Sequence, residues 1–137
     1  MKTKLTFIFL LSIVSTIISA DALVDLSIGQ LVNMQKNKNA LVVDIRTEKE
    51  WQTTGTIPGS HKLQFFSSQG KYDAEKWLAE LSQLKTSQDQ PVILVCRSGG
   101  RSGMVGNMLT KQQGMKNIHH LSSGITSWIK AGNEITK

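Results

Sequence analysis

The chain of 137 residues contains a single cysteine, Cys96, and only two prolines. One thiol cannot form an internal disulfide, so the sequence excludes a fold held together by disulfide bonds. It also excludes a lipid-modified cysteine near the N-terminus, because Cys96 lies far from that end. With few prolines, no low-complexity tract and no internal repeat, the composition is that of an ordinary globular chain.

Basic runs with interleaved aromatic residues are also missing, although the formal net charge is +6. Lys2 and Lys4 contribute to that charge, and without them the chain carries about +4. This modest excess predicts mild attraction for small anions and no nucleic-acid partner. The three histidines are His61, His119 and His120, and adjacent strand residues point to opposite faces of a sheet. No set of residues has metal-ligand spacing, so we expect no metal and no cofactor.

The first 22 residues have the pattern of a secretory signal peptide. A basic tetrapeptide precedes an apolar run over residues 5–18, and small residues follow. We expect cleavage after Ala20 or Ala22, export, and no stable membrane insertion afterwards. An uncleaved membrane anchor stays open as the alternative, although the run is shorter than the roughly 20 residues of a spanning helix. The predicted division is a signal at 1–22 and a single domain of about 115 residues at 23–137.

Capping patterns and apolar runs alternate along the predicted domain. Helices are expected where a capping residue or an apolar stripe marks them: from Ser27 to about Lys36, from Thr47 through Trp51, from Asp73 to about Lys85, from about Met104 to Gly114, and over 122–132. Strands are expected over 40–46, around Lys62 and Leu63, over 92–96 and over 117–121. This alternation predicts an α/β fold, a parallel sheet with helices on both faces that binds ligands beyond the carboxyl ends of its strands.

The cysteine stands where one of these buried strands ends. After Cys96 come two arginines, two serines and two glycines, namely Arg97, Ser98, Gly99, Gly100, Arg101 and Ser102. Glycines allow successive backbone N–H groups to point inward, and the following helix adds the positive end of its dipole, so we expect a cradle for an anion. Positive charge and donated hydrogen bonds favour a thiolate. The sequence therefore predicts that Cys96 is a nucleophile rather than a small core residue.

The stretch Cys-Arg-Ser-Gly-Gly-Arg-Ser at 96–102 resembles the active-site loop of the rhodanese family of sulfurtransferases. The resemblance implies that Cys96 attacks the outer sulfur of thiosulfate or another small anionic donor, releases sulfite and carries a persulfide, from which cyanide or a thiol takes the sulfur. Loop amides at residues 97–102 would bind the anion, and Arg97 and Arg101 would attract the donor. No histidine lies near the motif in the sequence, which fits a nucleophile that needs no general base.

Two further segments are similar to the same family. Residues 44–60 contain its Asp-x-Arg strand end and its Gly-x-Ile-Pro-Gly turn, with Thr56 at a usual histidine and Ser60 at a usual alanine. Near the C-terminus, residues 123–128 hold a Ser-Gly pair where two glycines are usual, and retain the tryptophan. The resemblance therefore covers residues from about 26 to 132, and together with the signal it implies a small exported protein of a bacterial periplasm.

The pair Asp44 and Arg46 is interpreted as supporting the end of its strand near the loop rather than as catalytic. A polar loop from Gln64 to Tyr72 contains two phenylalanines. We expect both rings to be packed, and the alternative is that this loop overhangs the mouth of the active site.

Two alternative functions stay open. Cysteine phosphatases and arsenate reductases have five residues between cysteine and arginine, whereas this chain has Ser102 at that position and Arg101 one residue early. That count favours sulfur transfer. The other alternative is a non-catalytic or carrier module that receives persulfide sulfur from a partner protein, because a fold does not by itself fix a function.

Overall fold

A computed structural model describes residues 13–15 and 21–137, and most of the signal predicted at 1–22 lies outside the described residues. The described elements are, in chain order, β1 (Val24–Leu26), α1 (Ile28–Asn37), β2 (Leu41–Asp44), α2 (Glu48–Thr54), β3 (His61–Lys62), α3 (Ala74–Leu84), β4 (Val92–Val95), α4 (Gly100–Lys111), β5 (Ile118–Leu121) and α5 (Gly124–Lys130). Within this part of the chain, no helix combines the length and the hydropathy needed to cross a bilayer.

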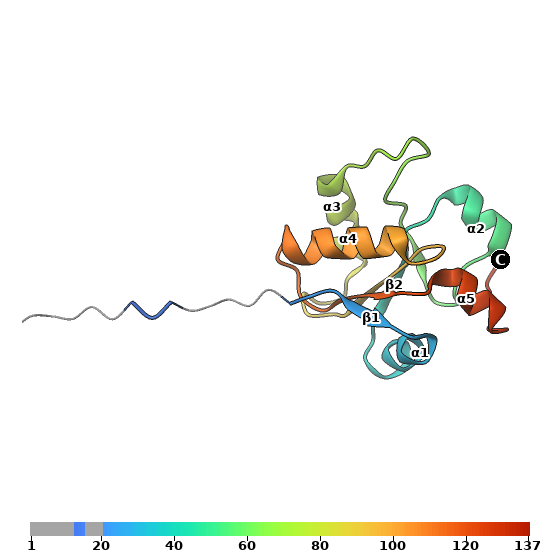
Figure 1. The fold of residues 1–137 in the computed structure, drawn as a ribbon, viewed down its shortest axis with the longest axis horizontal. Coiled ribbons are helices and arrows are strands. Elements are labelled where there is room, and N and C mark those ends of the chain that lie inside the picture. Colours follow the sequence, from blue (N-terminus) through green and yellow to red (C-terminus); the bar gives the residue numbers. More distant parts are fainter. Residues whose placement is uncertain (1–12, 16–20) are drawn as a thin grey trace, which may run out of the picture.

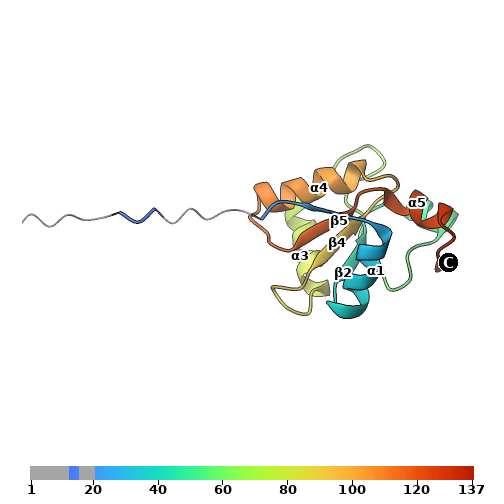
Figure 2. The same cartoon turned by 60° about the horizontal axis from the view of Figure 1, so that its bottom comes forward.

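The five strands form one sheet in the order β1-β5-β4-β2-β3, and every pairing between them is parallel. Helices α3 and α4 cover one face, and α1 and α5 cover the other (Figure 1). Figure 2 shows the same three layers from a second direction, with β4 and β5 side by side in the sheet. The predicted α/β fold, a parallel sheet with helices on both faces, is confirmed.

Alternate residues of the central strands build a core on each side of the sheet. Val43 and Leu94 pack with residues of α3 and α4, whereas Val42 and Ile93 pack with residues of α1 and α5. All four residues of β2 and all four of β4 are buried. Strands covered on both faces read as unbroken apolar runs, which is why these two were recognisable in the sequence.

Capping residues set the starts of three helices as predicted. At α1, the Gln30 amide donates to Ser27 Oγ (3.2 Å) while the Ser27 amide donates to Gln30 Oε1 (2.8 Å). Thr47 and Glu50 form the same reciprocal box at α2, and Asp73 accepts a backbone N–H in the first turn of α3. Each box satisfies amides that the helix itself leaves without a partner.

Three details differ from the prediction. Strand β1 was not expected, because a three-residue strand carries little pattern of its own and is stabilised by pairing with β5. Helix α4 begins at Gly100 rather than near Met104, because Gly99 adopts a left-handed conformation (φ 101°) that lets the chain turn directly into the helix. Ser123 occupies the N-cap of α5 but makes no side-chain cap bond, since its backbone is helical rather than extended.

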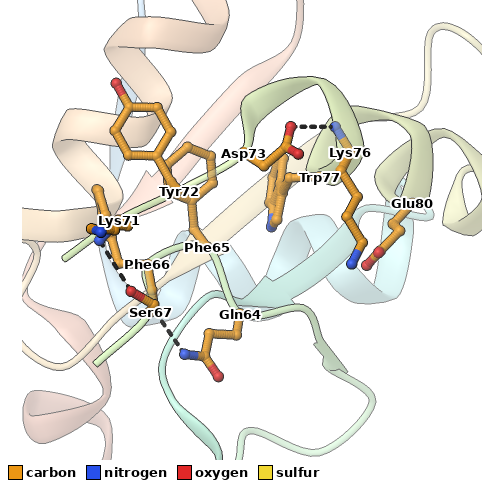
Figure 3. Close-up of a pocket in the computed structure, with 10 residues that line it drawn as sticks. All are labelled: Gln64, Phe65, Phe66, Ser67, Lys71, Tyr72, Asp73, Lys76, Trp77 and Glu80. Carbon is orange, nitrogen blue, oxygen red and sulfur yellow. Dashed lines mark hydrogen bonds between the residues drawn. The ribbon is translucent and has the colours of Figure 1, made fainter. Parts of the chain in front are cut away.

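The loop between β3 and α3 packs its aromatic side chains together and also lines a surface pocket (Figure 3). Phe65 is buried and contacts Tyr72 (ring centroids 5.0 Å apart) and Trp77 (5.2 Å), as the close-up in Figure 3 shows. Phe66 is partly buried against the same core cluster. The prediction that the two phenylalanines serve packing is confirmed.

Candidate active site

The sulfur of Cys96 lies in a cradle of donors directly after β4. The residue is buried (1% exposed), and its Sγ accepts the backbone N–H of Gly99 (3.1 Å) and of Ser102 (3.4 Å). The Ser102 hydroxyl lies 3.3 Å from the same sulfur. Because Gly100 to Ser102 form the first turn of α4, the sulfur also faces the positive end of this 12-residue helix. Such an arrangement stabilises negative charge on sulfur.

The turn between β5 and α5 holds this loop in place through backbone hydrogen bonds. The amides of Ile125 and Thr126 donate to the carbonyls of Cys96 (2.9 Å) and Arg97 (3.1 Å). Two glycines allow the close approach, since a Cβ on Gly99 would overlap the Ser122 carbonyl and a Cβ on Gly124 would overlap the Arg97 carbonyl. The cradle is therefore built jointly by the ends of β4 and β5.

Arg101 points to α2 and forms a two-pronged ion pair with Glu50. Its Nη2 lies 2.6 Å from Glu50 Oε1, and its Nη1 lies 2.9 Å from Oε2. Hydrogen bonding from this guanidinium lowers the pKa of Glu50 to about 2, although partial burial opposes the shift. The same bond to Glu50 raises the pKa of Arg101. The predicted attraction of the sulfur donor by Arg101 must therefore compete with a carboxylate that already holds its charge.

Arg97, in contrast, is exposed, and no ion pair involves it among the described residues. Its side chain borders a pocket of about 450 Å³ between α2 and α5, which is also lined by Lys49, Thr126 and Ile129. Ser98 and Gly100 are exposed on the same loop. Of the predicted binding groups in this loop, Arg97 is thus the cation that is free to meet an anion from solvent.

Asp44 and Arg46 form a buried pair at the end of β2, each 1% exposed. Arg46 Nη2 lies 2.8 Å from Asp44 Oδ2 and also donates to the Gly55 carbonyl (2.9 Å), while Nη1 donates to Thr54 Oγ1 (2.9 Å). These bonds join the end of β2 to the end of α2, the helix that carries Glu50. The pair supports the site through that helix and makes no hydrogen bond to Cys96.

Sequence reasoning missed a histidine behind the cysteine. His120 Nδ1 lies 2.8 Å from Ser102 Oγ, and His120 Nε2 lies 2.7 Å from Asp25 Oδ1. No histidine is close to the motif in the sequence, but one is close in space, because β5 pairs directly with β4 and brings His120, 18 positions further along the chain, against Ser102. Strand alternation identified the two faces of His119 and His120, but nothing in the sequence gave the pairing of the strands.

A group of three or more His, Cys, Asp or Glu side chains that would suit a metal ion is not found within residues 13–15 and 21–137. What the described site offers is a buried sulfur with hydrogen-bond donors and a helix N-terminus. That arrangement suits covalent chemistry in which the sulfur attacks an electrophile and then carries a negatively charged group.

Comparison with known proteins agrees with this chemistry. The thiosulfate sulfurtransferase GlpE of Pseudoalteromonas translucida is 28% identical over 109 residues, which cover 80% of this chain and 91% of that protein. An uncharacterised protein of Rickettsia rickettsii is 36% identical over 90 residues, 64% of this chain and 71% of that protein. The polysulfide-sulfur transferase homodimer of Wolinella succinogenes shares the fold, with a TM-score of 0.62 at 19% identity over 83% of this chain and 78% of that one.

The similarity to a sulfurtransferase supports sulfur transfer in general, whereas the Wolinella structure shows the shared fold alone. Residues 27–131, which include every strand but β1 and all five described helices, match the model of the Rhodanese-like domain. The chain belongs to the rhodanese family.

Proposed function

We propose that this protein is a thiosulfate sulfurtransferase, which moves a sulfane sulfur from thiosulfate or a similar donor through a persulfide on Cys96 to cyanide or a thiol. The observation that carries the proposal is the position of Cys96 Sγ, which accepts the N–H groups of Gly99 and Ser102 at the start of α4. These donors remain in place whether the negative charge is on the thiolate or on a persulfide.

The proposed reaction has two displacement steps at sulfur. The Cys96 thiolate attacks the outer sulfur of thiosulfate, a new S–S bond forms, and sulfite leaves with the electron pair of the bond that breaks. Cyanide then attacks the outer sulfur of the persulfide, thiocyanate is released, and the electron pair of the breaking S–S bond returns to Cys96 as thiolate. With an acceptor thiol, the sulfur leaves as the acceptor's persulfide instead. Neither step requires a protein group to protonate the leaving group.

Different parts of the loop have different roles in this proposal. Amides of residues 97–102 hold the anionic donor and the persulfide, and exposed Arg97 attracts the donor from solvent. Arg101 keeps the start of α4 in position through Glu50. Burial of the sulfur favours a small donor over a bulky protein, which supports the enzyme over the carrier alternative.

The same contacts weigh against a phosphatase or an arsenate reductase. Those enzymes grip an oxyanion with an arginine at the position that Ser102 occupies here, and the hydroxyl of Ser102 is engaged with Cys96 and His120. The neighbouring guanidinium of Arg101 is turned to Glu50. Neither Ser102 nor Arg101 is therefore in a position to bind the oxyanion as that arginine does.

We further propose that the protein is exported to the periplasm and acts there as a single-domain rhodanese similar to phage shock protein E. Its support is the signal-like N-terminus together with the position of Leu23, which packs against the core on the side of α4. Cleavage after Ala20 or Ala22 would leave this contact and β1 intact. N-terminal sequencing of protein from periplasmic extracts should begin at Asp21 or Leu23, and a start at Met1 in the membrane fraction would contradict export.

A thiocyanate assay tests the activity. Purified protein with thiosulfate and cyanide should form thiocyanate, and Cys96→Ser should be at least about 10³-fold slower, since removal of a covalent nucleophile abolishes the two-step route. Phosphate monoesters and arsenate should not be turned over. Absence of thiocyanate from the wild-type reaction, or an unchanged rate in the variant, would contradict the proposal.

A further inference from the structure

A continuous chain of polar groups runs from the buried sulfur to the protein surface. Cys96 Sγ lies 3.3 Å from Ser102 Oγ, which lies 2.8 Å from His120 Nδ1. On the far side of the ring, His120 Nε2 lies 2.7 Å from Asp25 Oδ1. Ser102 and His120 are buried, whereas the Asp25 side chain is 74% exposed. This series of hydrogen-bonded groups thus begins at the nucleophile and ends at a carboxylate exposed to solvent.

The register of the sheet produces this alignment. Asp25 on β1 pairs with His120 on β5, and His120 pairs with Leu94 on β4, so the three side chains stand on the same face. Gly103 of α4 leaves room for the imidazole, since a Cβ there would lie 3.4 Å from His120 Cε1. The two hydrogen-bond partners of the ring are therefore one acid, Asp25, and one hydroxyl, Ser102.

The hydrogen-bond donors along the chain can be assigned. The Asp25 carboxylate accepts a hydrogen from Nε2, which leaves Nδ1 of a neutral imidazole as an acceptor. Ser102 has one hydroxyl hydrogen, which it donates to Nδ1 at 2.8 Å in preference to the Gly99 carbonyl at 3.3 Å. Its oxygen accepts the S–H of a Cys96 thiol. Protonation of Nδ1 reverses both bonds: the ring then donates to Ser102, and Ser102 donates to a Cys96 thiolate.

We propose that Ser102, His120 and Asp25 form a proton relay that converts the Cys96 thiol to the thiolate. The thiol proton moves to Ser102 Oγ while the serine proton moves to His120 Nδ1, and the S–H electron pair stays on sulfur. The product is a thiolate next to a hydroxyl donor, with an imidazolium held by Asp25. No electrons are transferred and no further reactant is needed. This inference deepens the proposed function, in which His120 acts through Ser102 as a positioning residue.

Alkylation of Cys96 by iodoacetamide tests the relay without any sulfur transfer, so its result is independent of the proposed function. The sharpest variant is His120→Asn, whose amide still hydrogen-bonds Ser102 but cannot take up a proton. At neutral pH its alkylation should be about tenfold slower than that of the wild type, and at alkaline pH, where hydroxide ionises the thiol directly, the two rates should converge. The matched control is His119→Asn, the neighbouring histidine on the opposite face of β5, which should alkylate at the wild-type rate.

Three outcomes would overturn the relay. One is a wild-type rate for His120→Asn at neutral pH. Another is a deficit that persists at every pH, which would indicate a structural role alone, and the third is an equal deficit in His119→Asn. If His120→Asn does not fold, the exposed Asp25→Asn decides the question: its alkylation should be about threefold slower at neutral pH and should recover at alkaline pH, with the smaller effect due to solvent around the carboxylate. A wild-type rate in Asp25→Asn would then refute the proposal.

Discussion

At the sulfur of Cys96, the hydrogen-bond partners are two backbone amides and the Ser102 hydroxyl rather than charged side chains. The amides of Gly99 and Ser102 lie 3.1 and 3.4 Å away, whereas the guanidinium of Arg101 is bound to Glu50. Backbone amides are fixed by the fold and require no side-chain ordering when charge develops on the sulfur. The donors that the loop offers to a negative charge thus come mainly from its backbone.

Glu50 links that loop to the neighbouring helix α2. Its folded pKa of about 2 lies below the ordinary value of 4.5, so the folded protein keeps the carboxylate at a pH where the unfolded chain has protonated it. The Glu50–Arg101 pair therefore contributes stability above pH 4.5, and this contribution is lost as the pH falls from 4.5 to about 2.

The Glu50→Gln variant should be less stable than the wild type by about 1 kcal/mol near neutral pH, a modest value because solvent reaches the pair. The difference should shrink as the pH falls towards 2, which urea unfolding at a series of pH values would measure. Glu48→Gln on the exposed side of the same helix is the control and should change stability by less than about 0.5 kcal/mol. A difference for Glu50→Gln that is constant over the whole pH range would contradict this account.

The nucleophile and its loop could be predicted from the sequence because they are contiguous. Cys96 and Ser102 lie in one motif, and glycine, arginine and serine each have a stated physical role there. His120 and Asp25 could not be predicted, since His120 lies 18 positions after Ser102 and Asp25 lies far before Cys96 in the sequence. The contact between His120 and Asp25 spans 95 positions. Such a contact is set by strand pairing, which a single sequence does not reveal.

At the scale of elements, the turn from β5 into α5 matters as much as the cysteine loop that it supports. Gly124 has φ 71°, and a Cβ at this position would overlap the carbonyl of Arg97. Any side chain there would be strained by the backbone and would also push the loop that holds the sulfur. The family resemblance placed a glycine here, and the structure supplies the physical reason for it.

Gly124→Ala should therefore destabilise the protein by about 3 kcal/mol and slow the alkylation of Cys96, because both strain and overlap apply. Gly132→Ala provides a matched control, since Gly132 also has positive φ (79°) but open space around its Cα. It should lose only about 1 kcal/mol, and Cys96 should react normally. Equal losses in the two variants, measured by chemical denaturation, would show that the overlap with Arg97 has no effect.

Elements with local signals were predicted well, and elements without them were not. The capping boxes at Ser27 and Thr47 are local hydrogen-bond patterns, and the starts of α1 and α2 follow them. Strand β1 has no such pattern: it is three residues long, and two of them are exposed. Its existence depends on β5, which lies at the other end of the chain.

Over the whole molecule, the site results from the strand order. Central β4 has β5 on one side and β2 on the other, and all of these strands are parallel. Their carboxyl ends therefore meet at one edge of the sheet, where they supply Cys96, the turn before α5 and the Asp44–Arg46 pair. Successive connections leave this region in opposite directions, from β2 to β3 and from β4 to β5, an arrangement that leaves space for a ligand.

If thiosulfate forms a persulfide on Cys96, intact mass spectrometry detects it directly. Purified, reduced wild-type protein and Cys96→Ser should be weighed before and after exposure to thiosulfate, and again after cyanide. We expect a gain of one sulfur atom in the wild type alone, which cyanide reverses. A wild type that gains no sulfur, or a gain that also occurs in Cys96→Ser, would contradict it.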